Sequence, residues 1–195
     1  TILATYEQVA VAFGRERSQT LFERSWLDRM LANIPPPRRC LDLGCGTGLP
    51  VARYLVEQRA LVTGVDGAAA MLELFEANVP EATALHADMR ALSLDGKFQG
   101  ILAWNSFFHL SQSDQRGMFP IFAAHAAPGA VLMFTSGPKA GEVMGVAGGQ
   151  PVYHSSLDPD DYRQLMDQNG FEVLQYVPED PSCAGHTVWL ARFRG

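Results

Sequence analysis

A run of alternating glycines limits most strongly what this chain can fold into. Three glycines alternate from Gly44 to Gly48, directly after an apolar segment at 40–43. Glycine has no Cβ, so the backbone here can turn sharply and come close to a ligand. Residues 50–58 have helical spacing, and the free N–H groups of a helix N-terminus point to the same place. The segment therefore predicts a strand, a glycine turn and a helix that together bind a nucleotide-type ligand.

The spacing of these glycines separates two classes of cofactor. The dinucleotide fingerprint G-x-G-x-x-G requires a glycine at the position of Leu49. The chain instead has G-x-G-x-G, with Asp42 two positions before the first glycine. The stretch from Asp42 to Gly48 resembles motif I of the class I methyltransferases that use S-adenosylmethionine. The alternative is a glycine-rich turn that binds nothing.

Strand and helix patterns alternate along the chain as far as residue 170, which predicts a mostly parallel sheet. The link between the last two predicted strands is short, so these two must be antiparallel. We therefore predict an α/β fold, a three-layer doubly wound seven-stranded sheet with its last strand reversed, as the resemblance also implies. The predicted strands are 40–43, 61–65, 82–86, 98–103, 130–135, 171–177 and 187–193.

The 195 residues are enough for one sizeable core, and we predict a single domain. Segment 136–156 is rich in glycine and has little pattern of its own, which is typical of functional lids or of disorder. We expect it to be a substrate lid that is mobile without ligand and closes over the acceptor. The predicted parts are an N-terminal helical cap at 1–38, a cofactor-binding core at 39–135, the lid at 136–156, and a C-terminal helix with the antiparallel strand pair at 157–195.

Two aspartates follow predicted strands and are candidate cofactor ligands. Asp66 lies 22 positions after Gly44, where an acid can accept hydrogen bonds from both ribose hydroxyls. The alternative for Asp66 is a solvated turn residue before Gly67. The resemblance implies that Asp88 binds the adenine amino group, but a capping or turn aspartate is equally open.

The loop after the fourth predicted strand is the next candidate. The resemblance implies that it passes the methionine part of the cofactor and opens onto the acceptor, and aromatic faces such as Trp104 attract a sulfonium cation. Many members of the family have an acid where Asn105 stands, so we predict hydrogen bonding rather than base catalysis there. The predicted cofactor-binding residues are Tyr6, Asp42, Gly44, Cys45, Gly46, Gly48, Asp66, Gly67, Met71, Asp88, Met89, Trp104 and Asn105.

Histidines are the candidate catalytic groups, because histidine titrates near neutral pH. Reversal of the last strand brings His186 to the carboxyl edge of the sheet, where we expect it to meet Tyr153 and His154. We predict His109, His154 and His186 as residues that act as a base or orient the acceptor. An exposed loop residue and a satisfied strand end are the alternatives for His154 and His186. The predicted substrate-binding residues are Phe108, His109, Tyr153, His154 and His186.

These features predict transfer of a methyl group from S-adenosylmethionine to a small-molecule acceptor, which is an oxygen or nitrogen nucleophile or a carboxylate. The expected product of the cofactor is S-adenosylhomocysteine, and no residue spacing suggests a metal. Two alternatives stay open. A nicotinamide-dependent oxidoreductase is disfavoured by Leu49, and a non-catalytic S-adenosylmethionine-binding protein is disfavoured by the predicted lid and its histidines.

Composition bounds the partners and the compartment. Lys and Arg number 15 against 21 for Asp and Glu, and the net charge of −6 argues against nucleic acid as the main partner. No apolar run approaches the length of about 18 residues that a membrane span needs, and no signal-peptide pattern is present. Three scattered cysteines form neither a disulfide framework nor a zinc spacing. We expect a cytoplasmic protein without membrane contact, either a monomer or a homodimer.

Overall fold

A seven-stranded sheet forms the centre of the molecule, with the strand order β3-β2-β1-β4-β5-β9-β8. The structure is a computed structural model and describes residues 4, 20–147 and 149–195, so the candidate Tyr6 and much of the predicted cap lie outside the described residues. The strands of this sheet are β1 (Arg39–Leu43), β2 (Leu61–Asp66), β3 (Thr83–His86), β4 (Phe98–Ala103), β5 (Ala126–Ser136), β8 (Phe171–Asp180) and β9 (His186–Phe193).

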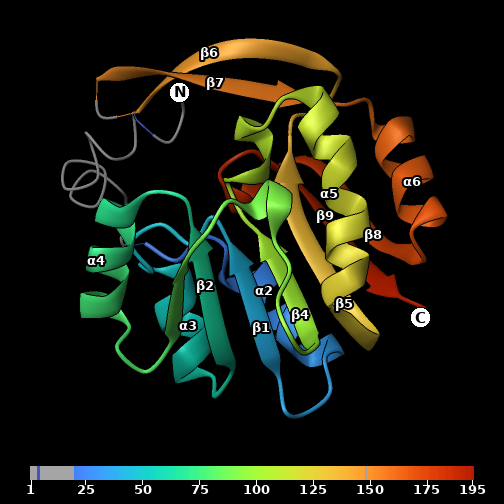
Figure 1. The fold of residues 1–195 in the computed structure, drawn as a ribbon. Coiled ribbons are helices and arrows are strands. Elements are labelled where there is room, and N and C mark those ends of the chain that lie inside the picture. The colour runs from blue at the N-terminus through green and yellow to red at the C-terminus, as the bar shows by residue number, and fades with distance from the viewer. Residues whose placement is uncertain (1–3, 5–19, 148) are drawn as a thin grey trace.

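The strand directions confirm the predicted fold class. β1 to β5 pair in parallel, and β9 pairs antiparallel with both β5 and β8. The reversal follows from the short link 181–185, which leaves no room for a crossover between β8 and β9. All carboxyl ends of the parallel strands point to one edge, at the top in Figure 1.

Helices cover both faces of the sheet, which gives the three predicted layers. Residues alternate along β4: Ile101 packs in the core under α5 and α6, whereas Leu102 packs in the core under α2 and α3. None of the helices in the described part of the chain is long and apolar enough to cross a membrane. The helices are α2 (Arg24–Asn33), α3 (Val51–Glu57), α4 (Ala69–Asn78), α5 (Gln112–His125) and α6 (Pro159–Gln168), with short 3-10 turns η1 (Met89–Ala91), η2 (Phe107–His109) and η3 (Pro181–Cys183).

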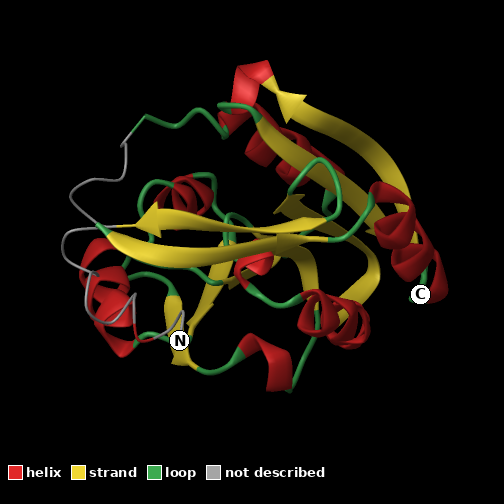
Figure 2. Ribbon diagram, turned by 90° about the horizontal axis from the view of Figure 1, so that it is seen from above, coloured by secondary structure: helices red, strands yellow, loops and turns green. Residues whose placement is uncertain are grey.

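Segment 136–156, which has little pattern of its own in the sequence, contains a regular β-hairpin, and its role as a substrate lid stays a prediction. Strands β6 (Gly141–Ala147) and β7 (Gln150–Ser156) pair antiparallel over their whole length. Two of the glycines in this segment are required by the hairpin itself, one by its turn and one by a neighbouring side chain. Gly149 has a φ of +75° in the turn, and a Cβ on Gly145 would lie 2.9 Å from the His154 ring. The hairpin extends across the carboxyl ends of the parallel strands, as Figures 1 and 2 show from two directions.

Candidate active site

A cavity of about 300 Å³ lies at the carboxyl ends of the first four strands of the sheet, a volume at the lower end of the range for ligand sites. Asp42 and Gly48 line a smaller cavity beside it instead, of about 20 Å³. The predicted cofactor-binding residues that line the larger cavity are Gly44, Cys45, Gly46, Asp66, Gly67, Met71, Asp88, Met89, Trp104 and Asn105.

The glycine turn forms one wall of the cavity. Gly44 has a φ of +74°, and a Cβ built on it would lie 2.2 Å from the Cβ of Ser106. The Ser106 hydroxyl also donates to the Leu43 carbonyl at 2.6 Å, so the loop after β4 sits directly against the turn after β1. Gly46 differs, since a Cβ added there meets no atom within 4 Å. Packing forces a glycine at Gly44 and also at Gly48, where a Cβ would lie 2.7 Å from Val79, while Gly46 leaves space open to a ligand.

Asp66 lies at the tip of β2 and also holds the glycine turn in shape. One carboxylate oxygen accepts from the Gly46 N–H at 2.9 Å, and the other accepts from the Ala68 N–H at 2.9 Å. The carboxylate thereby joins the turn after β1 to the start of α4. Because a carboxylate accepts several hydrogen bonds at once, its position in the cavity wall also suits ribose hydroxyls.

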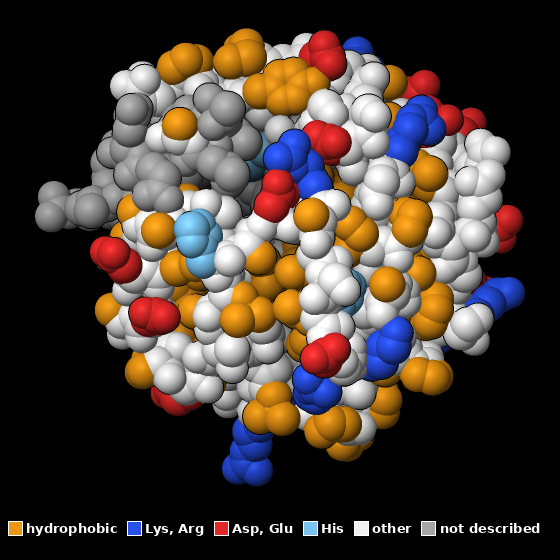
Figure 3. Space-filling view, viewed as in Figure 1, with side chains coloured by type: hydrophobic (Ala, Val, Ile, Leu, Met, Phe, Trp, Pro, Cys, Tyr) orange, Lys and Arg blue, Asp and Glu red, His pale blue; other side chains and the backbone are white. Residues whose placement is uncertain are grey.

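An ion-pair cluster lies at the rim of the same cavity. Arg90 contacts Asp88 at 2.7 Å and Asp114 at 3.2 Å, and all three residues line the cavity. The Asp88 carboxylate also accepts from the Arg90 backbone N–H, so it caps η1, and the Arg90 side chain lowers the pKa of Asp88. Asp88 therefore acts as a capping residue, which is one of the two roles the sequence allows. Its contact with the adenine amino group stays a prediction. Acidic and basic side chains lie next to one another on the face seen in Figure 3.

Sequence reasoning missed Arg90 and Asp114. Arg90 follows Asp88 by two positions, and Asp114 lies in the first turn of α5, after the N-cap residue Ser111. The signal for Asp114 was present, because a helix that follows a parallel strand begins at the edge where ligands bind. Arg90 gave no comparable signal.

His186 starts β9 at the expected edge but lies against a different neighbour than predicted. Its ring stacks on Trp104, with centroids 5.9 Å apart, and on Phe22 at 5.4 Å. Among the described residues no ring contact joins His186 to Tyr153 or His154. Trp104 belongs to the core under α2 and α3, which explains why its partner His186 is on that side rather than under the hairpin.

Two of the predicted histidines do come together. The rings of His109 and His154 lie 4.9 Å apart, and Phe108 packs edge-on against both of them. His109 lines the cavity, and its Nδ1 lies 3.1 Å from the Tyr153 carbonyl oxygen. A carbonyl only accepts, so Nδ1 carries the proton and Nε2 is the acceptor nitrogen. Burial lowers the pKa of His109 to about 4 and also lowers the pKa of His154, so both rings are uncharged at neutral pH.

Comparison with known proteins identifies the class to which this fold and cavity belong. A family model described as a methyltransferase domain matches residues 13–176. The chain therefore belongs to this methyltransferase family, which confirms the resemblance to class I methyltransferases that the glycine turn predicts. The match does not support the alternative of a nicotinamide-dependent oxidoreductase.

Relatives with assigned substrates fall into two groups. The chain is 33% identical over 101 residues to a dTDP-3-amino-3,6-dideoxy-α-D-glucopyranose N,N-dimethyltransferase of Streptomyces fradiae, covering 51% of this chain and 39% of that protein. It is 30% identical over 179 residues to a malonyl-[acyl-carrier protein] O-methyltransferase of Halorhodospira halophila, covering 85% and 57%. The chain spans about half the length of the curated relatives it matches.

A solved structure supports the fold. The amino pentose methyltransferase CalS10 of Micromonospora echinaspora, solved with S-adenosylmethionine bound, superposes with a TM-score of 0.73 at 21% identity. The match covers 94% of each chain. Over the described residues the chain has no group of three or more His, Cys, Asp or Glu side chains arranged to hold a metal ion.

Proposed function

We propose that this chain transfers a methyl group from S-adenosylmethionine to the amine nitrogen of a small molecule and releases S-adenosylhomocysteine. The observation that carries the choice of an amine is the neutral, hydrogen-bonded His109 in a cavity wall with an excess of carboxylates. Family membership supports the reaction class.

The described residues fit the cofactor in three respects. Space is open beside Gly46, where an added Cβ meets no atom within 4 Å, and the Asp66 carboxylate that accepts from the Gly46 N–H lies next to it at the tip of β2. The buried indole N–H of Trp104 has no hydrogen-bond acceptor among the described residues, which suits a ligand that brings one. When bound, S-adenosylmethionine supplies a methyl group activated by a sulfonium. The chain's task is to hold the acceptor in line and to exclude water.

Charge in the cavity wall favours an acceptor that is an amine. Among the described residues the charged groups of the wall are Asp66, Asp88, Asp114 and Arg90, and Arg90 is paired with two of the three carboxylates. The wall therefore carries an excess of negative charge, which attracts an amine that can protonate and repels a carboxylate. His109 adds no positive charge, because burial keeps it neutral.

His109 then acts by orientation. Its Nε2 accepts a hydrogen bond from an amine N–H, which directs the nitrogen lone pair toward the methyl group. The nitrogen has a free lone pair only in the neutral amine, so an ammonium attracted to the wall gives up one proton to solvent before transfer. A ring with a pKa of about 4 does not keep a proton at neutral pH, so the methylated product leaves as an ammonium and loses its proton to solvent. His109 is therefore assigned a positioning role in contact with the acceptor rather than the role of a strong base.

Calorimetric titration with S-adenosylhomocysteine and with a nicotinamide dinucleotide tests the cofactor assignment. We expect binding of the first and no response to the second. Turnover of S-adenosylmethionine in the presence of an aminosugar tests the reaction. Binding of the dinucleotide alone, or binding of S-adenosylhomocysteine without turnover on any amine, would overturn the proposal.

A further inference from the structure

One fully buried amide lies between the loop that carries His109, which lines the cavity, and strand β7 of the hairpin. Gln115 on α5 is 0% exposed, on the same helix face as Met118, Phe119 and Phe122. That face packs into the core under α5 and α6, where an apolar side chain of the same size would fit the pattern. An amide at such a position is stable only if its polar atoms are hydrogen-bonded.

The hydrogen bonds of Gln115 reach the loop directly before α5 and, about 40 positions further along the chain, β7 and α6. Its Nε2 has two N–H groups and lies within hydrogen-bond distance of three acceptors, the Leu110 carbonyl at 3.0 Å and the carbonyl and hydroxyl oxygens of Ser155, each at 2.9 Å, so one N–H is shared between two of them. Its Oε1 accepts from the Tyr162 hydroxyl of α6 at 2.5 Å. The Ser155 hydroxyl donates to the Leu110 carbonyl as well, at 2.6 Å. Both ends of the amide are therefore engaged, and the network is closed.

These hydrogen bonds hold the residues that directly follow His109 and His154 in the chain. Leu110 follows His109 directly, and Ser155 follows His154 directly in β7. The loop and the strand then meet a second time where His109 Nδ1 contacts the Tyr153 carbonyl. The position of His109 relative to the hairpin thus depends on how Gln115 holds the base of β7 against the loop.

We propose that Gln115 is a positioning residue for the methyl acceptor, which acts by fixing the base of the β6–β7 hairpin against the loop that carries His109. The kinetic part of this inference rests on the proposed function. The base of the hairpin then backs the loop after β4, which itself lines the cavity, and Gln115 sets the register between the hairpin and that loop. A closed polar network of this kind specifies one arrangement, which an apolar residue at the same position would not do.

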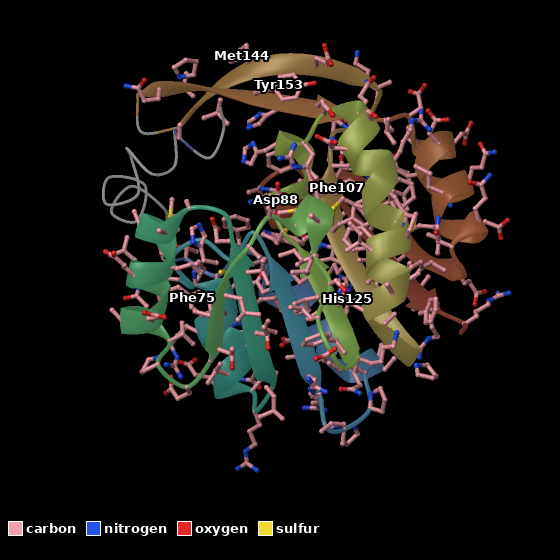
Figure 4. The ribbon with its side chains drawn as sticks, in the orientation of Figure 1. Phe75, Asp88, Phe107, His125, Met144 and Tyr153 are labelled. Atoms are coloured by element: carbon pink, nitrogen blue, oxygen red, sulfur yellow. The ribbon has the colours of Figure 1, made fainter. Side chains whose placement is uncertain are left out.

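The test compares Gln115→Met with a matched variant on the same helix. His125 provides the control because, like Gln115, it is a buried polar residue of α5 with both polar ends hydrogen-bonded. It is 2% exposed, and its ring nitrogens bond to the Ile121 carbonyl and the Leu94 N–H. It lies at the end of α5 away from the hairpin (Figure 4). His125→Leu therefore removes a buried polar group of the same helix without touching the acceptor side.

Three measurements are made on each variant: a histidine-ring NMR titration, the Kd for S-adenosylhomocysteine, and the KM for an amine acceptor. In Gln115→Met we expect the pKa of His109 to rise from about 4 toward its ordinary value, because the loosened hairpin base admits water. We expect KM for the amine to rise about tenfold and Kd for S-adenosylhomocysteine to stay within about twofold. His125→Leu should lower the melting temperature and leave all three quantities unchanged.

Ser155→Ala is the milder second variant, used if Gln115→Met does not fold. It removes one hydroxyl of the network and should shift the His109 titration and KM in the same direction by a smaller amount. An unchanged His109 titration in both variants, or an equal KM rise in His125→Leu, would overturn the assignment. The titration needs neither cofactor nor turnover, so failure of the wild type to methylate any amine would reject the proposed function and still leave the Gln115 inference tested.

Discussion

The cofactor end of the cavity is built from the tips of neighbouring parallel strands, whereas the acceptor end is built from a loop and a hairpin held together by side chains. At the cofactor end, Gly44 follows β1 directly and Asp66 ends β2, and the Asp66 carboxylate bonds to backbone N–H groups of the adjacent turns. At the acceptor end, Leu110 and Ser155 are 45 positions apart and meet through a hydroxyl and an amide. The first end tolerates little change in backbone, and the second end depends on a few buried polar groups.

The largest effect is expected where backbone atoms are closest. Gly44→Ala places a Cβ about where Ser106 lies, at a positive φ, and should reduce the binding of S-adenosylhomocysteine below detection in calorimetry. Gly117→Ala on α5 is the matched control, because a Cβ there meets no atom within 4 Å. Near wild-type affinity in Gly44→Ala would show that the backbone of the glycine turn can shift to accommodate a Cβ. The cofactor end would then be no more sensitive to backbone change than the acceptor end.

A smaller effect is expected at the tip of β2. Asp66→Ala removes the bonds to the Gly46 and Ala68 N–H groups together with any bonds to ribose. We expect a loss of binding free energy on the order of 3 kcal/mol in titrations with S-adenosylhomocysteine, because bonds to a charged acceptor are strong. Asp66→Asn keeps one acceptor oxygen and should lie between this variant and the wild type. Unchanged affinity in both variants would make Asp66 a turn residue alone.

Substitutions at the acceptor end should change the rate of methyl transfer and the folding stability at low pH, and leave the affinity for the cofactor product unchanged. His109→Phe keeps an aromatic ring and removes the acceptor nitrogen, so single-turnover methylation at saturating cofactor should slow about tenfold with unchanged Kd for S-adenosylhomocysteine. His154→Phe is the comparison, because His154 is not part of the cavity wall. A wild-type rate in His109→Phe would move the orienting role to another group.

Burial of His109 also predicts a pH dependence of folding stability. Its folded pKa of about 4 lies below its value of 6.5 in a model compound, so the unfolded chain binds more protons in that window. Stability should therefore fall as pH drops from about 6.5 to about 4, by about 3 kcal/mol at most from this residue. Denaturant unfolding at several pH values should show a weaker decline in His109→Phe, and parallel curves would contradict the assignment.

The smallest effect is expected at the rim. Asp88→Asn keeps a capping oxygen for the Arg90 N–H but weakens the ion pair with its side chain. Because this pair is partly exposed, we expect a change in the Kd for S-adenosylhomocysteine of about threefold. Comparison with an analogue that lacks the adenine amino group separates the two roles of Asp88. An equal loss for both ligands would leave capping as its only role.

The two ends also differ in how far the sequence predicted them. The glycine turn and Asp66 were found from local spacing, because each contact there is fixed by a strand tip and the residues next to it. His186 was brought to the correct edge by strand reversal, but strand order alone does not say on which side of the sheet a side chain at that edge packs. Its neighbour Trp104 decided this.

The sequence does not predict the hairpin, because closely spaced glycines are typical of breaks in a strand pattern. Gly145 leaves room for the His154 ring and Gly149 forms the turn, and both tasks require knowledge of the partner strand. Gln115 gave a signal that went unused, since it is a polar residue at an apolar position of a helix face. Its partners Leu110 and Ser155 come from segments whose meeting depends on tertiary structure.

Mass spectrometry of the acceptor after reaction with methyl-labelled S-adenosylmethionine tests the central claim most directly. Three small molecules of the same skeleton, bearing an amine, a hydroxyl or a carboxylate at one position, are offered to the wild-type chain at saturating cofactor. The carboxylate-rich wall and the neutral His109 predict that the label appears on the amine nitrogen and on neither of the other two. Label on the carboxylate in preference to the amine would contradict this account of the site.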